Sequence, residues 1–469
     1  MAAVVAALFL AAGVPSAARG QSVRPLTTGF ADDVYFGPAA LSDPWFERTV
    51  ASGAKLVLLD VEWAGIAPAN RPPGFDPANP GDPAYSWEGV DSAVRAASRR
   101  GLSVALLVNR APSWAEGPGR PAGAAPGSWR PDPAAFGRFA AAAARRYSGT
   151  YPDPLVPGAT LPHVGYWQAW AEPNLGVHLA PQWVVGQGRF VPASPGIYRG
   201  LLNAFYDAVK AVDPANRVIT AGTAPFGDPI PGGPRMPPAR FVRELLCLRD
   251  ASLAPAPCPD PAHFDILAHH PYSVGAPRRA ARNRDDVSLP DLGKLTRPLA
   301  AALRLGRALP RAPKPVWVTE FSYDSNPPDP GGVPAPEQAR WLEEAFYVLW
   351  SQGVDTVAWY LIRDQPPVPS YASSYQSGIY LRDGRPKPAA RAFRFPFVVE
   401  PAGRGRVVAW GKSPVAGVLS IQSRRGARWV SVAHVPVTAG AVFLRRLALA
   451  GHAGLRATVG AETSLIWQT

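Results

Sequence analysis

Short apolar runs alternate with longer helical patterns over most of the chain. The runs typical of strands cover residues 33–36, 55–61, 103–108, 164–170, 217–221, 264–268, 316–319 and 356–361. Helical patterns with Ser or Asp before the first turn, Pro within it or Gly after the last turn cover residues 43–51, 87–100, 133–147, 195–212 and 336–352. Because parallel neighbours need crossover connections, this alternation predicts an α/β fold with a parallel sheet, closed as a (β/α)8 TIM barrel.

The pattern changes near residue 397. From there on, only short β-type runs occur, at residues 406–410, 418–422, 429–434, 442–447 and 464–467, and no helical period remains. Such spacing favours a small antiparallel β-sandwich. We therefore expect a signal peptide over residues 1–20, a barrel over 21–398 and an accessory β-domain over 399–469. An open doubly wound sheet would need a glycine-rich phosphate loop after an early strand, and the sequence has none.

Composition and charge exclude only a few classes of function. Pro and Gly together fill 100 of 469 positions (56 and 44), without a collagen period, which indicates many rigid loops. The net charge is +13, and residues 400–469 hold nine basic and two acidic residues, or +7. The arginines are scattered and no basic stripe is interleaved with aromatics, so we expect no nucleic-acid partner. The basic C-terminal part is compatible with contact to an acidic glycan or a cell wall.

The N-terminus and the cysteines both favour export. Residues 2–14 form an uncharged apolar run, too short to span a bilayer, and small residues at Ser16 and Ala18 suit signal-peptidase cleavage. No Lys or Arg precedes the run, so an uncleaved anchor is the alternative. Cys247 and Cys258 bracket a Pro-rich loop, which predicts a disulfide in an oxidising compartment. We expect a secreted or extracytoplasmic monomer.

Two glutamates follow buried strands. Glu172 ends the fourth predicted strand, within the sequence Trp-Gln-Ala-Trp-Ala-Glu-Pro-Asn, and Glu320 ends the seventh, within Val-Trp-Val-Thr-Glu. The active sites of such barrels lie at the carboxyl ends of the strands. A carboxylate that is partly desolvated there, beside a second one, has a raised pKa, so one group stays protonated while the other is ionised. Either Glu alone would more simply be a loop cap or a salt-bridged surface residue.

Taken together, the Trp-x-x-Trp-Ala-Glu-Pro-Asn motif and the Trp-Val-Thr-Glu strand 148 positions later (320 − 172) resemble clan A of the glycoside hydrolases, and most of all families 39 and 5. The resemblance covers about residues 30–398. It implies that Glu172 is the acid/base and Glu320 the nucleophile of a retaining glycosidase, which needs no cofactor or metal. It also implies that Tyr272, in His270-Pro271-Tyr272, hydrogen-bonds the nucleophile, and that Trp359 floors the sugar site.

Further candidates for substrate binding are Trp114, Asn109, Asn174 and His270, at or after strand ends. Sugars present apolar C–H faces and polar edges, so aromatic rings beside carboxylates suit them. Core packing is the alternative for both Trp114 and Trp359. His269 is expected to be structural, because neighbouring side chains of an extended segment point to opposite sides.

The resemblance has one departure, Ala171, where the clan usually has an Asn that binds the sugar 2-hydroxyl. Three explanations stay open: Asn109 substitutes for it, the substrate carries a 2-acetamido or other bulky group, or the barrel is weakly active or inactive. The expected function is therefore a secreted retaining glycoside hydrolase that cleaves a poly- or oligosaccharide. The alternative is a carbohydrate-binding barrel with little or no catalysis.

Overall fold

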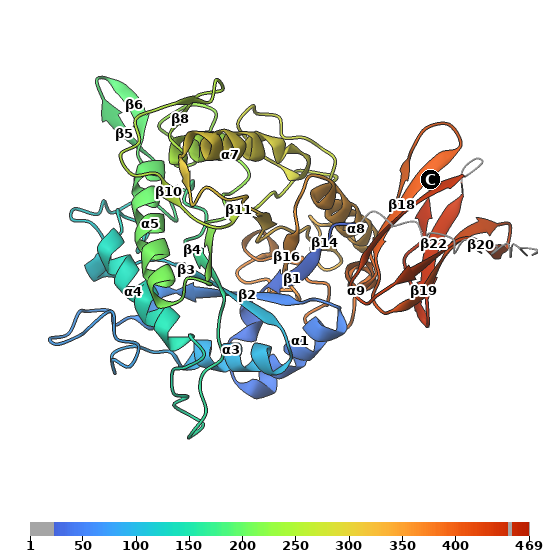
Figure 1. Cartoon of the computed structure of the whole chain (residues 1–469), viewed down its shortest axis with the longest axis horizontal. Coiled ribbons are helices and arrows are strands. Elements are labelled where there is room, and N and C mark those ends of the chain that lie inside the picture. The colour runs from blue at the N-terminus through green and yellow to red at the C-terminus, as the bar shows by residue number, and fades with distance from the viewer. Residues whose placement is uncertain (1–22, 449–452, 469) are drawn as a thin grey trace, which may run out of the picture.

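The computed structural model describes residues 23–448 and 453–468; the expected signal peptide lies outside them. Eight parallel strands form the central sheet, in the order β11-β13-β16-β1-β2-β3-β4-β7 (Figure 1). Bridges from Ile219 to Ile266 and from Thr223 to His269 connect its two edge strands, so the sheet is a nearly closed barrel. The strands are β1 (Thr27–Ala31), β2 (Leu56–Glu62), β3 (Ser103–Asn109), β4 (Tyr166–Ala169), β7 (Arg217–Thr220), β11 (Leu267–His269), β13 (Val316–Val318) and β16 (Thr356–Tyr360).

The prediction of the first strand was wrong. Residues Asp33–Tyr35 form a 3-10 helix, and the strand lies earlier, at Thr27–Ala31. Gly29 weakened the strand signal, yet the fold needs it, because a Cβ there would overlap the carbonyl of Leu56 on the neighbouring strand. The other seven predicted strands are confirmed, with small differences at their ends.

Helices surround the barrel, and the five predicted ones are confirmed (Figure 1). In α4, Asp132 accepts a hydrogen bond from the backbone N–H of Ala135 at 2.6 Å and Pro133 occupies the first turn, as the sequence predicts. Four α-helices among the described residues were not predicted: α2, α6, α7 and α9. The bounds are α1 (Ala39–Ala51), α2 (Trp63–Ile66), α3 (Glu88–Arg99), α4 (Pro133–Arg146), α5 (Ser194–Val212), α6 (Pro238–Leu245), α7 (Gly293–Leu305), α8 (Ala335–Ser351) and α9 (Pro388–Arg394).

Two apolar layers result from strand alternation. Leu58, Leu107, Ile219, Ala268 and Trp317 fill the inside of the barrel, and Ala171 belongs to the same cluster. Their neighbours along each strand face the helices and form the larger outer core. Four of these five strand residues are followed two positions later by a polar residue, which therefore lies at the barrel mouth: Asp60, Asn109, His270 and Thr319.

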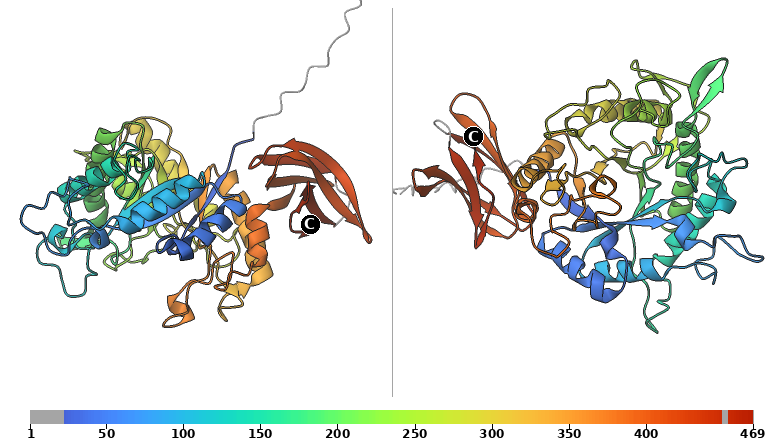
Figure 2. Two further views of the ribbon diagram at one scale, coloured as in Figure 1. Left: turned by 90° about the horizontal axis from the view of Figure 1, so that it is seen from below. Right: turned by 180° about the vertical axis from the view of Figure 1, so that it is seen from behind.

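The C-terminal part consists of antiparallel sheets, as predicted, in the orders β17-β18-β21 and β20-β19-β22-β23, with β24 beside β22. They lie to one side of the barrel, next to α8 and α9 (Figures 1 and 2). Strand β17 begins at Phe397, so the expected boundary at 398/399 falls inside it. The bounds are β17 (Phe397–Pro401), β18 (Arg406–Lys412), β19 (Gly417–Arg425), β20 (Arg428–Val437), β21 (Val442–Ala448), β22 (Gly454–Val459), β23 (Glu462–Thr463) and β24 (Trp467–Gln468).

The sheets and the barrel share one continuous apolar core, which includes Phe393 of α9, Val398 of β17 and Trp410 of β18. Across the same boundary, Arg394 forms an ion pair with Glu462 at 2.5 Å, and Nζ of Lys412 donates to Oγ1 of Thr28 at 3.1 Å. The two parts are therefore packed directly against each other.

Short elements occupy the long loops, and the Gly/Pro-rich segments 118–133 and 225–238 are largely irregular. A disulfide joins Cys247 and Cys258, which confirms that prediction. Among the residues that the structure describes, no helix has the length and apolar character needed to cross a membrane. The remaining strands are β5 (Trp183–Gly186), β6 (Arg189–Pro192), β8 (Leu248–Arg249), β9 (Ala254–Pro255), β10 (Ala262–His263), β12 (Ala308–Leu309), β14 (Ser325–Asn326) and β15 (Val333–Pro334).

Candidate active site

The end of β4 has an unusual backbone that presents Glu172 at the barrel mouth. Trp170 and Glu172 both have positive φ, 74° and 38°, a region that residues other than Gly adopt rarely. The surroundings hold this conformation: the N–H of Glu172 donates to the carbonyl of Gly222 at 3.0 Å, and the indole N–H of Trp170 donates to the carbonyl of His178 at 3.0 Å. Such strain concentrates at functional sites.

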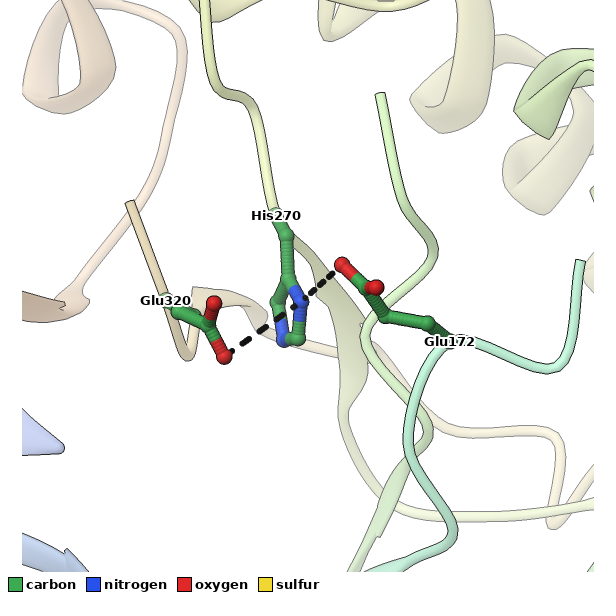
Figure 3. Close-up of side chains that lie close together, drawn as sticks. All are labelled: Glu172, His270 and Glu320. Atoms are coloured by element: carbon green, nitrogen blue, oxygen red, sulfur yellow. Dashed lines mark hydrogen bonds and ion pairs between the residues drawn. The ribbon is translucent and has the colours of Figure 1, made fainter. Parts of the chain in front are cut away.

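His270 lies between the two glutamates (Figure 3). Its Nδ1 is 2.9 Å from Oε1 of Glu172 and 3.8 Å from Oε2 of Glu320. One donor atom from each of the three residues lies within 4.8 Å of the other two. The fold thus brings together the two carboxylates that are 148 positions apart (320 − 172) in sequence.

Other side chains hold this trio in place. The hydroxyl of Tyr272 donates to Oε1 of Glu320 at 2.6 Å, which is the contact that the resemblance implied. Nε2 of His270 lies 3.1 Å from Oγ1 of Thr319, and Nε2 of His178 lies 3.7 Å from Oε2 of Glu172. Each carboxylate therefore has a neighbour besides His270.

The electrostatics separate the two carboxylates. Burial raises the pKa of Glu172, but the hydrogen bond and positive charge of His270 outweigh it, so the pKa lies below its usual value. Burial and the charge of Glu172 raise the pKa of Glu320, although His270 partly opposes this. Burial lowers the pKa of His270, yet the two glutamates raise it above its usual value. These directions favour a proton on His270 and an ionised Glu172.

This order is the reverse of the sequence-based expectation of a protonated Glu172 beside an ionised Glu320. The reason is that His270 donates to Glu172 at hydrogen-bond distance and reaches Glu320 only at 3.8 Å. Transfer of one proton along the 2.9 Å contact from Nδ1 to Oε1 would leave a neutral imidazole and a protonated Glu172. A single short proton movement therefore separates the resting state from a state able to donate a proton.

Asn109 lies near the same mouth. Its Nδ2 donates to Oδ1 of Asp60 at 2.7 Å, and its own Oδ1 is buried without a hydrogen-bond partner. Burial, together with the charges of Asp33, Glu62 and Glu320, raises the pKa of Asp60 to about 8. A neighbouring hydroxyl or other protonated group could form hydrogen bonds with both Asn109 and Asp60. The role of Asn109 in substrate binding stays a prediction.

Two predicted substrate contacts were wrong. Asn174 is fully buried; its Nδ2 donates to the carbonyls of Ala224 and Met236, both at 3.1 Å, so it braces loop backbone. Trp359 is also fully buried in the outer core, where its indole N–H donates to the carbonyl of Ser377 at 2.8 Å. Strand alternation places the next residue, Tyr360, against the inner cluster instead.

Trp114 is half-buried, with its indole N–H donating to the carbonyl of Pro68 at 2.9 Å and its ring packed against Trp63 at 5.7 Å. Its contact with a substrate stays a prediction. The expectation for His269 is confirmed: it is buried and bonded to Thr223 and to the carbonyl of Val287. Burial lowers the pKa of His269 to about 4, so it is neutral.

Several residues around the site were not predicted from the sequence. His178 and Thr319 contact the trio directly, and Tyr360 packs against Tyr375 with ring centroids 5.0 Å apart. The charge of Glu320 contributes to the raised pKa of both tyrosines. Position alone could have indicated Thr319, beside Glu320, and Tyr360, at the end of β16; nothing in the sequence marked His178 or Tyr375.

A divalent cation could be held by the same trio, since carboxylates and imidazole are metal ligands. However, a metal on Nδ1 would need the lone pair that carries the proton donated to Glu172. Metal binding and the hydrogen-bonded arrangement therefore exclude each other. The expectation that the protein needs no metal or cofactor stays a prediction.

No protein-family model matches the chain, and no curated protein matches it by sequence. Solved structures do match the fold. A family 39 glycoside hydrolase from Bacteroides cellulosilyticus WH2 is 17% identical, with a TM-score of 0.56 over 91% of this chain and 79% of that one. A monomeric beta-xylosidase from Caulobacter crescentus CB15 is 14% identical, with a TM-score of 0.50 over 92% and 98%.

A glucosidase from Croceicoccus marinus is also similar, at 14% identity and a TM-score of 0.50 over 89% of this chain and 82% of that one. At such low identity these matches establish the fold. The chain shares with these glycoside hydrolases the fold of a (β/α)8 barrel, and its C-terminal part is all-β.

Proposed function

We propose that the protein is a secreted retaining glycoside hydrolase that acts on a poly- or oligosaccharide. The observation that carries the proposal is the spacing of Glu172 and Glu320, which bring one carboxylate oxygen each to within 4.8 Å at the mouth of the barrel. Retaining enzymes have carboxyl groups about 5–5.5 Å apart, whereas inverting ones leave about 6.5–9.5 Å for a water molecule. The disulfide between Cys247 and Cys258 supports export.

In this mechanism Glu320 attacks the anomeric carbon while the bond to the leaving oxygen breaks. Glu172 donates its proton to that oxygen. Glu172 then removes a proton from water, whose oxygen attacks the anomeric carbon and releases Glu320. Tyr272, 2.6 Å from Glu320, stabilises the ionised nucleophile between turnovers. His270 exchanges a proton with Glu172 and so sets its protonation for each step.

Two substitutions test the roles. Glu320→Gln removes the nucleophile and should abolish turnover on every substrate while retaining binding. Glu172→Ala should fail on substrates with poor leaving groups, yet still form glycosyl-enzyme from activated aryl glycosides, because these need little acid assistance. Added azide should then release a glycosyl azide of retained configuration, measured by NMR. Equal losses on both substrate classes, without azide rescue, would refute the assignment of Glu172.

Ala171 favours a second candidate, a carbohydrate-binding barrel with little catalysis. Its small side chain offers no hydrogen bond to the sugar 2-hydroxyl, a contact that strengthens in the transition state. The intact trio of Glu172, His270 and Glu320 favours the enzyme, because partly buried carboxylates placed side by side without a function are costly. Covalent labelling of Glu320 by a panel of fluoro-sugars separates the two: the binding protein would not be labelled.

A further inference from the structure

A groove of about 730 Å³ adjoins the catalytic mouth. One wall is the loop after β1 with helix α1, and the other is the loop after β16. Asp33 lines its inner end, and its charge contributes to the raised pKa of both Glu320 and Asp60. The inner end of the groove is therefore close enough to the catalytic mouth for the charge of Asp33 to act on Glu320.

Two arginines from distant parts of the sequence line this groove and contact the same aromatic ring. Arg48 projects from α1 and Arg363 from the loop after β16, and their guanidinium carbons lie 4.4 and 5.0 Å from the ring centroid of Trp45. Arg48 also lies 5.4 Å from the ring centroid of Tyr380. Trp45 is itself only 5% exposed, so its indole serves as a support for the two guanidiniums and offers no stacking surface to a sugar.

Neither guanidinium has an anionic partner. Within residues 23–448 and 453–468, no ion pair or hydrogen-bonded acceptor satisfies either one, although both line the groove. Arg side chains positioned by an aromatic ring keep a fixed fork of donors, which matches a carboxylate or a sulfate. The guanidinium groups of Arg48 and Arg363 are therefore available to bind an anion.

The acidic residues of the groove do not serve as that anion. Asp364 is buried and paired with Lys387 at 2.6 Å. Asp32 accepts hydrogen bonds from the backbone N–H groups of Val34, Ile362 and Arg363, and burial raises its pKa to about 7. Asp33 is exposed at the inner end, toward Glu320. The groove therefore has free positive charge beside Trp45 and free negative charge only near the catalytic centre.

We propose that this groove is a subsite for an anionic sugar unit, held by Arg48 and Arg363, and that the substrate is an acidic glycan bearing carboxylates or sulfate esters. The inference rests on the proposed glycosidase function and names the class of its substrate. The net charge of +13 also favours an acidic glycan as the substrate, because it attracts polyanions to the protein.

Affinity electrophoresis of the Glu320→Gln variant tests the proposal by binding alone, without turnover. The gels contain alginate, polygalacturonate, chondroitin sulfate or carrageenan, each beside its carboxyl-reduced or desulfated counterpart. At least one acidic polymer should retard the protein, and its neutralised counterpart should not. The carboxylate and sulfate pairs distinguish the two sources of anion.

The double substitution Arg48→Gln/Arg363→Gln, in the same background, should weaken that binding by about tenfold or more, since each charge-assisted hydrogen bond contributes substantially. Arg304→Gln is the matched control: it removes one positive charge from an exposed residue on α7, across the barrel from α1 (Figure 1). If the double variant is unstable, Arg363→Lys, on a loop, should keep the charge yet still weaken binding because the fork is lost.

Three results would overturn the proposal: no acidic polymer retards the protein, the neutralised polymers bind equally well, or Arg304→Gln weakens binding as much as the double substitution. Hydrolysis of activated aryl glycosides by the wild-type protein reports separately on the proposed function. A protein that cleaves these glycosides but ignores acidic polymers would be a glycosidase without this subsite.

Discussion

Gly222 lies directly against the imidazole ring of His270, so that a Cβ at position 222 would overlap Nε2 and the adjoining ring atoms. The backbone carbonyl of Gly222 also accepts the N–H of Glu172 at 3.0 Å. One glycine thus permits the position of the histidine and anchors the strand end that carries the candidate acid/base.

Gly222→Ala should therefore displace His270 and lower kcat/KM on activated aryl glycosides by at least about 100-fold, since small misplacements of catalytic groups cost this much. Gly89→Ala, in α3, is the control: nothing lies within 4 Å of a Cβ there, and Ala favours a helix. The proposed geometry would be wrong if both variants retained wild-type kinetics.

Tyr272→Phe removes the hydrogen bond that stabilises ionised Glu320. The pKa of Glu320 should then rise, and because attack needs the ionised form, the acidic limb of the kcat/KM profile should move to higher pH. A hydrogen bond to a charged group contributes about 1.5–3 kcal/mol, or about one to two pH units. Tyr206→Phe, on α5, should leave the profile unchanged.

Tyr360 and Trp359 offer a test of which face of β16 meets the sugar. Tyr360→Ala should raise KM and lower kcat/KM with little change in melting temperature, since Tyr360 borders the inner cluster and is partly exposed. Trp359→Ala should instead destabilise the fold by about 3–5 kcal/mol, because it empties a buried site in the outer core. Thermal unfolding and steady-state kinetics on the same samples separate the two effects; a reversed pattern would restore Trp359 as the platform.

Lys412 is buried where β18 meets the barrel, and burial lowers its pKa from 10.5 to about 8. Between these two values the unfolded chain binds more protons than the folded one, so stability rises with pH across this window. Lys412→Met should accordingly stabilise the protein at pH 7, by up to about 3 kcal/mol, and much less at pH 10. Lys314 is shifted similarly but is present in both proteins, so it cancels from the difference. Equal effects at both pH values would contradict this account.

Alternation of short apolar runs and helices was sufficient to predict the barrel, and the two strand-end glutamates were sufficient to locate its candidate site. The sequence did not show which residues of each strand face the inside of the barrel. Strand β16 is apolar on both faces, so alternation gives no sign of which residue points inward. The resemblance therefore led to Trp359 instead of Tyr360. The first strand was misplaced for another reason: residues 33–36 have three consecutive apolar or aromatic side chains, whereas Gly29 weakens the pattern of the true strand.

Contacts between distant loops were beyond sequence reasoning altogether. Arg48 and Arg363 contact the same ring, Trp45, although they are 315 positions apart (363 − 48). No local pattern encodes this arrangement; it depends on the closure of the barrel, which brings the loops after β1 and β16 side by side.

The apolar core that runs without interruption from the barrel into the C-terminal sheets has a mechanical consequence. A carbohydrate-binding module on a flexible linker changes its position relative to its catalytic domain. These sheets share a core with the barrel and cannot move independently of it. Any polymer that they bind is held at a fixed distance and angle from Glu172 and Glu320. We therefore expect heat to melt both parts in one transition.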